Sequence, residues 1–339
     1  MRNKITLKEL SKLLNVSIST VSKALNDSPE ISQKTIDRVK ELALLHNYRP
    51  NPTAVNLKSS KSGTIAVIVP NISNFFFAKV LAGIEQEAQK KNLQVITYIS
   101  NESYEREKQI IDMISYGFVD GVLIAPSEET QKKKEYEHFK ELLEYELPVV
   151  LYDRINFDLP VDKIGVDDKG SIEDAVRLMH ENGLEKIGIV SAIQNLDVGV
   201  QRMEGYKEAV KDLNLKGFIA SHADVEPLRE KIRELLDAGV KGIVSTDIIG
   251  TLLTSRVAFE QGLKIPEDLK LIGYVNEDVA PYLSPSLSYI DQHPKKIGES
   301  AINFLYERIN STGKKAEPVK QVLKTEMVHL DSTRFSYLD

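Results

Sequence analysis

The sequence predicts two architectures in one chain: an all-α headpiece of the helix-turn-helix type with a short hinge helix, and then an α/β core of two doubly wound subdomains. Short amphipathic helices fill the first 50 residues, a proline-containing segment follows, and from Thr64 onward apolar runs of strand length alternate with helical patterns. Strands that alternate with helices form parallel βαβ units with right-handed crossovers. A chain of 339 residues also suits two or three domains rather than one core.

The segment Ser17–Asn26 predicts the central helix of the headpiece. Val21, Ala24 and Leu25 have the i, i+3, i+4 spacing of a face that packs inward. The opposite face, near the start of the helix, carries Ile18, Ser19, Ser22 and Lys23. Ser17 is a suitable N-cap residue because its hydroxyl can accept a hydrogen bond from a free backbone amide of the first turn.

One helix and a turn precede this segment, and a third helix follows it. The inner stripe of the first helix consists of Leu7, Leu10 and Leu14. Asn15 begins the turn, since Asn tolerates the left-handed conformation. The third helix starts after the N-cap Ser32 and runs to about Asn47, with Ile36, Val39, Leu42 and Ala43 on its inner face. This is the helix-turn-helix pattern, whose second helix enters the major groove of DNA; a helical hairpin with a solvated polar face is the alternative.

The charge distribution favours a DNA contact at one end of the chain. Residues 1 to 61 hold eleven Lys and Arg and five Asp and Glu, a net charge of +6 in a chain whose total is −6, so the remainder carries −12. A basic segment on an acidic body is what such a contact requires. A basic tail that binds membrane or RNA would have the same charge but would not need packed helices.

A short hinge helix is predicted after the headpiece. Pro50 ends the third helix, and Asn51 followed by Pro52 has the N-cap and N1 signals of a new helix. About seven residues remain before the linker Ser59–Gly63. Helices shorter than ~12 residues are marginal alone in water, so this one should form only when DNA holds it, with Leu57 as an apolar wedge in the minor groove. A plain linker is the alternative.

The core is predicted from its strands and its last long helix. Strands are expected at residues 64–70, 94–99, 121–125, 148–152, 186–191, 217–219, 242–245, 269–273 and 321–328. A second set of strand–helix units begins near Ile164 and contains the strands from residue 186 to residue 273. The last long helix runs from Pro294 to about Asn310. Two doubly wound sheets would bind a ligand in the cleft between the carboxyl ends of their strands.

Several classes of protein are not expected. The chain has no cysteine, no P-loop, no Gly-x-Gly-x-x-Gly after a strand and no metal-spaced cluster among its six histidines, so we expect no enzyme, no cofactor and no metal. Asp167 and Asp168 look like a carboxylate pair, but neighbours on an extended chain point to opposite faces. No secretory signal and no run near the ~18 residues of a membrane span occurs, so we expect a cytoplasmic protein without membrane contact. A transport binding protein would need a signal peptide and no headpiece.

Eight segments have the order and spacing of one known family: Ile5–Leu10, Val16–Asn26, Asn47–Asn51, Asn74–Phe77, Val119–Leu123, Tyr152–Arg154, Arg202–Tyr206 and Leu287–Gln292. From residue 4 to about residue 330 the chain therefore resembles the lactose-repressor family of bacterial transcription regulators. Each tripeptide alone would be a weak signal, whereas the set is very specific.

The resemblance implies a ligand-responsive regulator, which we expect to be a repressor. It would have a DNA-binding headpiece at residues 1–50, a hinge helix and linker at 51–62, and an effector-binding, periplasmic-binding-protein-like core at 63–339. The N-subdomain would comprise about 63–165 and 294–323, and the C-subdomain about 166–293 and 324–339, with crossings near 165–168, 291–294 and 323–326.

The resemblance also implies a homodimer on a pseudo-palindromic operator, in which the effector shifts operator affinity as inducer or as corepressor. No heptad-rich tail follows the core, so we expect a dimer rather than a tetramer. A sugar-binding or sugar-modifying protein of the same core fold, without gene regulation, is the alternative function.

The DNA contacts implied by the resemblance fall into three groups. Base readout is assigned to Ile18, Ser19 and Lys23, of which Lys23 can donate to guanine O6 and N7. Phosphate contacts, which set the register on DNA, are assigned to Thr6, Ser17, Thr20, Ser22, Asn26, Ser32 and Thr35. The minor-groove residues of the hinge are Ala54 and Leu57.

The effector, a sugar or sugar derivative, is expected to contact seven side chains: Phe76, Phe77, Asp153, Arg202, Asp247, Asn276 and Gln292. Arg202 is expected to open a helix without a local acid, leaving its guanidinium for ligand oxygens; an ordinary surface arginine is the alternative. Core packing is the alternative for one of the two phenylalanines, and helix capping is an alternative or additional role for Asp247. Val275 departs from the family, which has an acid there that accepts two ligand hydroxyls, so sugar recognition should be altered although Asn276 can reach in.

Overall fold

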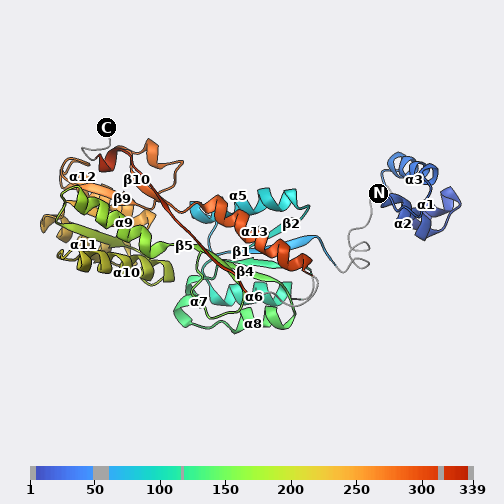
Figure 1. Ribbon diagram of the computed structural model, residues 1–339, viewed down its shortest axis with the longest axis horizontal. Helices are drawn as coiled ribbons and strands as arrows, with labels where there is room; N and C mark the ends of the chain where they lie inside the picture. The colour runs from blue at the N-terminus through green and yellow to red at the C-terminus, as the bar shows by residue number, and fades with distance from the viewer. Residues whose placement is uncertain (1–4, 49–60, 116–117, 312–316, 335–339) are drawn as a thin grey trace. The chain divides into compact units, whose positions relative to one another are not determined.

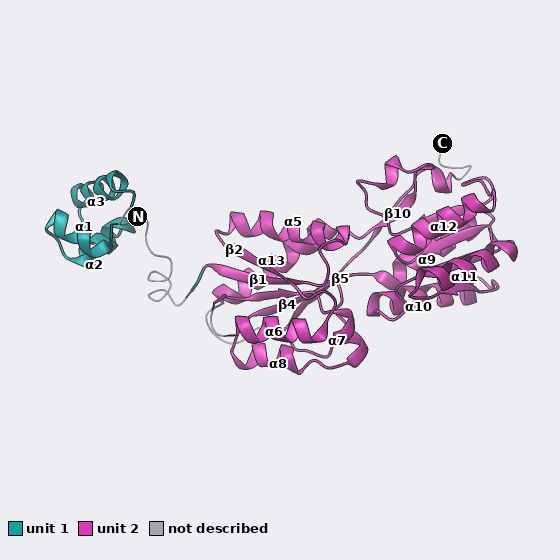
Figure 2. Ribbon diagram, turned by 180° about the vertical axis from the view of Figure 1, so that it is seen from behind, with its two compact units in different colours: residues 1–62 teal, residues 63–339 magenta. Residues whose placement is uncertain are grey.

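The computed structural model describes residues 5–48, 61–115, 118–311 and 317–334, which fall into two compact units (Figure 2). The first unit, the headpiece, ends at Ser62, and the second unit, the core, begins at Gly63. Each unit is described by itself.

The headpiece consists of three helices, α1 (Leu7–Leu14), α2 (Ile18–Leu25) and α3 (Gln33–Leu45). Its small core holds the buried side chains expected from the spacing: Leu10, Val21, Ala24, Ile36, Val39 and Ala43. Asn15 ends α1 in the left-handed conformation, at φ 55°, so that α2 can begin three residues later. The prediction of a helix-turn-helix unit is confirmed for these residues.

Hydrogen bonds at the helix starts explain where the headpiece helices begin. Thr6 and Glu9 form a capping box at α1, in which each side chain accepts a backbone amide of the other residue. Ser17 caps α2, its Oγ accepting from the Thr20 amide at 3.0 Å. Ser32 occupies the N-cap position of α3 but makes no capping hydrogen bond; its hydroxyl contacts that of Thr35 at 2.9 Å.

The core contains two six-stranded sheets, each covered by helices on both faces (Figure 1). We call the half with the first sheet the N-lobe and the other half the C-lobe. The N-lobe sheet has the order β11-β5-β4-β3-β1-β2 and the C-lobe sheet the order β12-β10-β9-β8-β6-β7. All neighbouring strands are parallel except β10 and β12. In both sheets the strand order reverses beside the first strand, β1 or β6, which is where doubly wound folds place ligands.

The strands are β1 (Thr64–Val69), β2 (Gln94–Ile99), β3 (Val122–Ile124), β4 (Val149–Tyr152), β5 (Asp162–Val166), β6 (Ile187–Ser191), β7 (Phe218–Ser221), β8 (Gly242–Ser245), β9 (Lys270–Gly273), β10 (Ser288–Asp291), β11 (Lys320–Leu323) and β12 (Glu326–Val328). The helices of the core are α5 (Phe75–Lys90), α6 (Tyr104–Ile114), α7 (Glu128–Lys133), α8 (Glu137–Glu144), α9 (Asp168–Glu181), α10 (Asp197–Asp212), α11 (Val225–Asp237), α12 (Ile248–Glu260) and α13 (Pro294–Asn310).

The structure differs from the predicted strands in two places. No strand was predicted at 162–166, where the structure has β5, which pairs with β4 in the N-lobe through Tyr152 and Ile164. The connection between these two parallel strands contains no helix, so the alternating pattern gave no sign of it. The single strand expected over 321–328 is two strands, since Leu323 pairs with Val166 in the N-lobe and Glu326 with Asp291 in the C-lobe.

The chain passes between the lobes three times, after β5, after β10 and after β11 (Figure 1). The return after β10 brings α13 against α5 on one face of the N-lobe sheet. The two helices approach so closely that a Cβ on Gly83 would lie 2.3 Å from the carbonyl oxygen of Lys295, and one on Gly298 would lie 2.2 Å from that of Val80. The last long helix is therefore fixed to the start of the core.

Candidate nucleic-acid interface and ligand cleft

The headpiece surface expected to contact DNA is built around the start of α2. Ile18, Ser19 and Lys23, the expected base-reading residues, lie on this helix and none of them is buried. The expected phosphate contacts are also at least partly exposed: Thr6, Ser17, Thr20, Ser22, Asn26, Ser32 and Thr35. Ala54 and Leu57, the expected minor-groove residues, lie outside the described residues. The structure leaves the ten described side chains accessible, and their contacts with DNA remain predictions.

Lys23 has a partner that the sequence analysis missed. Its ammonium forms an ion pair with Glu30, and the two side chains are 39% and 66% exposed. A pair so exposed adds little stability, so Lys23 can exchange the carboxylate for a guanine edge at small cost. Glu30 lies seven residues after Lys23 and beyond the end of α2. Side-chain pairs on a helix are expected at spacings of three or four residues, so the sequence did not indicate this pair.

The core encloses a cavity of about 220 Å³ between the lobes. All seven expected effector residues line it: Phe76, Phe77, Asp153, Arg202, Asp247, Asn276 and Gln292. The N-lobe contributes the first turn of α5 and the end of β4, and the C-lobe contributes α10, the start of α12 and the segment after β9. The structure thus brings residues more than 200 positions apart into one cleft.

Arg202 lies deep in this cleft, and two expectations about it were wrong. It is the sixth residue of α10 rather than the first, and Asp168 at the start of α9 is its acid partner. Its Nε donates to Asp168 Oδ1 at 2.7 Å and one terminal nitrogen donates to the Thr246 carbonyl at 2.6 Å. The ring of Tyr274 lies 3.6 Å from the guanidinium carbon. The guanidinium is therefore fixed in place and largely neutralised before any ligand arrives.

The pair Asp167 and Asp168 is divided by the start of α9, not by an extended chain. Asp167 caps the helix by accepting from the Gly170 amide at 2.9 Å, whereas Asp168 is the first helical residue and turns to Arg202. Burial raises the pKa of Asp168, and the Arg202 guanidinium opposes that rise. Burial likewise raises the pKa of Tyr274 to about 12, so its hydroxyl stays protonated and contacts Ser171 at 2.7 Å.

Asp247 and Asn276 hold the segments that border the cleft. Asp247 caps α12 by accepting from the Gly250 amide, and its second oxygen accepts from the Ala192 amide, both at 2.8 Å. Asn276 Oδ1 accepts from the Asp278 amide at 3.0 Å, which forms a turn after β9. Capping was an expected role of Asp247, and its bond to the loop after β6 adds a second structural role.

Phe76 and Phe77 differ in environment: one is part of the apolar core and the other mainly lines the cleft. Phe77 is buried in the apolar core of the N-lobe, which matches the packing alternative, although its ring also reaches the cavity. Phe76 is only partly buried and meets Phe77 edge to face, with ring centroids 5.2 Å apart. Val275 lines the cavity beside Asn276, so an apolar side chain does occupy the place where the family has an acid.

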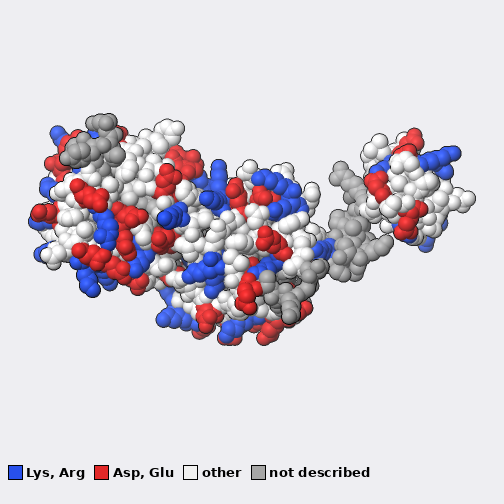
Figure 3. Space-filling model, viewed as in Figure 1, with Lys and Arg blue, Asp and Glu red and all other residues white. Residues whose placement is uncertain are grey.

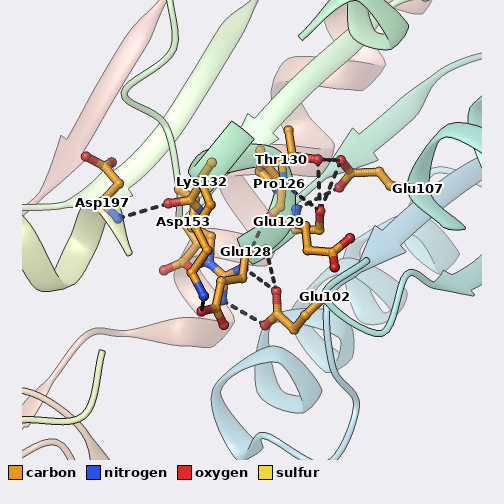
Figure 4. Close-up of polar contacts among 12 residues, drawn as sticks. Glu102, Glu107, Pro126, Glu128, Glu129, Thr130, Lys132, Asp153 and Asp197 are labelled. Atoms are coloured by element: carbon orange, nitrogen blue, oxygen red, sulfur yellow. Dashed lines mark hydrogen bonds and ion pairs between the residues drawn. The ribbon is translucent and has the colours of Figure 1, made fainter. Parts of the chain in front are cut away.

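Asp153 and Arg154 directly follow β4 and line the cleft. Arg154 makes a two-pronged ion pair with Glu102 at 2.6 and 2.9 Å and also donates to the Pro126 carbonyl at 2.8 Å. Glu102 accepts from the amide of Glu128 as well, and the buried Glu107 accepts from Thr130, so both carboxylates hold the start of α7 (Figure 4). Arg154 is thereby committed to the N-lobe, and its Nε is a buried donor without a hydrogen bond among the described residues.

Cleft residues that the sequence analysis missed include those that join the lobes. Lys79 on α5 forms ion pairs with Glu277 and Asp278 in the C-lobe. On another side, Asn156 and Gln131 of the N-lobe bond to the side chain and the amide of Asp197, each at 2.9 Å. These pairs are 41 to 199 residues apart along the chain, so no local pattern could have revealed them.

Two further observations concern the described residues. They contain no helix long and apolar enough to cross a membrane, and no group of three or more His, Asp or Glu placed to hold a metal ion. The visible face of the core carries Lys, Arg, Asp and Glu side chains side by side rather than in one large field (Figure 3).

Comparison with known proteins gives consistent results for both units. The family described as "Bacterial regulatory proteins, lacI family" matches residues 6–51, and the "Periplasmic binding protein-like domain" matches residues 176–333. The chain is 30% identical over 312 residues to the ribose operon repressor of Haemophilus influenzae, covering 90% of this chain and 92% of that protein. It is 28% identical over 337 residues to the NTD biosynthesis operon regulator NtdR of Bacillus subtilis, covering 97% of this chain and 99% of that protein.

The fold also matches a solved structure. The lac repressor dimer bound to operator and the anti-inducer ONPF aligns with a TM-score of 0.84 and 18% identity, over 97% of this chain and 99% of that chain. At this identity the match concerns the fold. It confirms the expected architecture of a helix-turn-helix headpiece followed by a periplasmic-binding-protein-like core.

Proposed function

The chain belongs to the lacI family of bacterial regulatory proteins, and we propose that it is a cytoplasmic transcriptional repressor that binds a pseudo-palindromic operator as a homodimer. A small effector, a sugar or sugar derivative, would bind in the cleft of the core and shift the affinity for the operator. The observation that supports this proposal best is the meeting of all seven expected effector residues in one cavity between two lobes. An enzyme or a sugar-binding protein without gene regulation is not favoured, because the relatives that cover nine-tenths of the chain are operon regulators.

The proposed mechanism is a two-state equilibrium of the core. An effector that binds one arrangement of the lobes more tightly shifts the population toward it, by no more than its difference in affinity for the two arrangements. If one arrangement favours the DNA-bound dimer, effector and operator affinities must be linked reciprocally. An effector that favours the DNA-bound state acts as corepressor, and one that disfavours it acts as inducer.

The test is selection of bound duplexes from a random pool by the purified dimer, with and without a mixture of sugars and sugar acids. We expect a palindromic site whose occupancy changes with one compound, and the direction of the change gives the sign of regulation. Recovery of no specific duplex under any condition would refute the proposal.

A matched pair of variants tests the base-reading surface. Lys23→Ala should weaken binding to the selected site by about 1–3 kcal/mol and relax the preference at one base pair. Lys40→Ala is the control, because Lys40 is likewise exposed and paired with a headpiece acid, Asp27, but lies on α3 outside the predicted contacts. Equal losses in the two variants would mean that Lys23 contributes charge and no sequence readout.

A further inference from the structure

The ligand cleft holds more negative than positive side chains. Its lining includes three cations and four carboxylates: Lys79, Arg154, Arg202, Asp153, Asp247, Glu277 and Asp291. Each cation also pairs with a carboxylate outside the lining, namely Asp278, Glu102 and Asp168. Three cations therefore face seven carboxylates, and a cleft with such a surplus concentrates ligands of positive charge.

Six of these seven carboxylates are already satisfied. Those paired with the three cations are Asp278, Glu277, Glu102 and Asp168. Asp247 accepts from the amides of Gly250 and Ala192, and Asp291 accepts from the amide of His293 at 2.8 Å. The remaining carboxylate, that of Asp153, is therefore the one available to pair with a cationic ligand.

Asp153 is buried, aimed into the cleft and without a hydrogen bond to its carboxylate among the described residues. Its side chain is 9% exposed, and Arg154 Nε, at 3.8 Å, is beyond hydrogen-bond distance. Arg154 cannot turn to it, because the fork of its guanidinium is occupied by Glu102. The Arg154–Asp153 ion pair is therefore a loose one, and the Asp153 carboxylate still lacks a hydrogen-bond donor. A buried carboxylate without a hydrogen bond is costly to keep ionised, and such groups are found preferentially at ligand sites.

The backbone supports the same conclusion. Asp153 adopts a φ of 67°, in the left-handed region, held there by the bond from its amide to the Ile164 carbonyl at 2.9 Å. A non-glycine residue in this region costs free energy that the surrounding structure must supply, and such residues cluster at ligand sites.

We propose that the effector carries an ammonium group, as an amino sugar does, and that this group pairs with Asp153. This inference rests on the proposed function only in taking the cleft as the effector site. An anionic effector such as a sugar acid would meet three cations already neutralised and one carboxylate that repels it. A neutral sugar could donate hydroxyls to Asp153 but would leave the surplus charge uncompensated.

The rest of the cleft fits a small ligand with one charged end. Its volume of about 220 Å³ lies below the ~300–1,000 Å³ of common ligand pockets, which suits a molecule of about one sugar ring. Apolar side chains from both lobes line the remainder: Phe75, Phe76, Ile193, Ile248, Ile249 and Val275. These side chains offer apolar surface to the uncharged part of such a ligand.

Protonation of Asp153 should govern binding of the amine. Burial raises the pKa of Asp153 to about 7; the nearby Arg154 and Arg202 lower it, while Asp168 and Glu102 raise it. An ammonium pairs only with the ionised carboxylate, so the protonated form must release its proton on binding. Affinity should therefore fall as the pH drops below about 7, by up to about tenfold per pH unit.

The experiment is calorimetric titration of the full-length protein with three pairs of probes: D-glucosamine and D-glucose, D-galactosamine and D-galactose, D-mannosamine and D-mannose. In at least one pair the amine should bind at least about tenfold tighter than its neutral partner at about pH 7.5, with the advantage shrinking at about pH 6. Asp153→Asn should abolish the advantage. Asp158→Asn should keep it, because Asp158 is an exposed acid of the same segment that does not line the cleft.

The outcomes separate this inference from the proposed function. No amine advantage in any pair, including no binding by any of the six sugars, overturns the inference, as does an advantage that survives in a folded Asp153→Asn protein. Operator binding is measured on the same samples. If only a neutral sugar shifts operator occupancy, the inference of a cationic effector is refuted, whereas the proposal of a ligand-responsive regulator is supported. If no operator is bound under any condition, the proposed regulatory function is refuted, and the titration still shows whether the cleft prefers amines.

Discussion

The headpiece and the core place their candidate functional residues in opposite environments. In the headpiece these side chains are exposed, and their partners lie three to seven residues away, as in Ser17 with Thr20 and Lys23 with Glu30. In the core they line a buried cleft, and their partners lie far along the chain, as Asp168 does from Arg202, 34 residues away. The residues expected to contact DNA thus have partners nearby in the sequence, whereas those expected to contact a small ligand are positioned by contacts between distant parts of the chain.

The energetic consequence is a difference in what a single substitution costs. Exposed pairs and caps contribute up to about 1 kcal/mol each, and their loss is local. Breaking a buried pair leaves an uncompensated charge and costs about 3–5 kcal/mol. The following predictions begin with the largest expected effect.

Two ion pairs between the same helices, α9 and α10, give the sharpest contrast. Arg202→Met should destabilise the core by about 3–5 kcal/mol, because Asp168 remains buried without a partner. Arg177→Met should cost less than about 1 kcal/mol, since the Arg177–Asp212 pair is 37% and 57% exposed. Urea unfolding of the full-length variants measures both.

The double variant Arg202→Met with Asp168→Leu shows whether the cost of Arg202→Met comes from the lost ion pair itself or from leaving the Asp168 carboxylate buried without a counter-ion. It should recover most of the stability lost in Arg202→Met, because no buried charge remains. Equal losses of stability in Arg202→Met and Arg177→Met would show that the cleft pair is not shielded from solvent. Buried pairs in the core would then contribute no more stability than exposed pairs such as those in the headpiece.

In the headpiece the largest effect should come from its apolar core and not from its polar surface. Leu10→Ala should cost about 2–5 kcal/mol, which approaches the whole stability of a small domain. Leu13→Ala is the control on the same helix, because Leu13 is 59% exposed and should cost under about 0.5 kcal/mol. Helix content by circular dichroism and specific DNA binding should fall together in Leu10→Ala; binding retained at full strength would show that the headpiece core is dispensable.

The smallest effect should come from the helix caps. Ser17→Ala should destabilise the headpiece by about 1 kcal/mol, because the hydroxyl satisfies the Thr20 amide. Ser32→Ala should cost less, since Ser32 makes no capping bond at α3. The difference is measured by thermal unfolding in the absence of DNA. An equal or larger cost for Ser32→Ala would be inconsistent with this account of the two helix starts.

The same contrast explains how far the sequence could predict the structure. Signals within a few residues of each other, such as Thr6 with Glu9 and the spacing of Val21 and Ala24, predicted the headpiece. In the core, apolar runs predicted most strands, but neither β5 nor β10 was recognised as a strand.

The candidate cleft shows a similar division. The resemblance to a family selected seven residues that do meet in one cavity. It could not supply their partners, such as Asp168 for Arg202 or Glu102 for Arg154, because long-range pairing leaves no mark in the local sequence. Nor could it reveal that, among the described residues, Asp153 is the one carboxylate lining the cleft that accepts no hydrogen bond.

The linkage between cleft and headpiece is tested by the affinity of the dimer for a compound found to shift operator occupancy, measured with and without the selected operator. We expect operator to change the affinity for the compound by the same factor by which the compound changes the affinity for operator, about 5–150-fold for typical linked sites. The direction of the shift identifies the compound as inducer or corepressor. An affinity for the compound that is identical with and without operator would show that the cleft and the headpiece are not linked, and would refute the proposed mechanism.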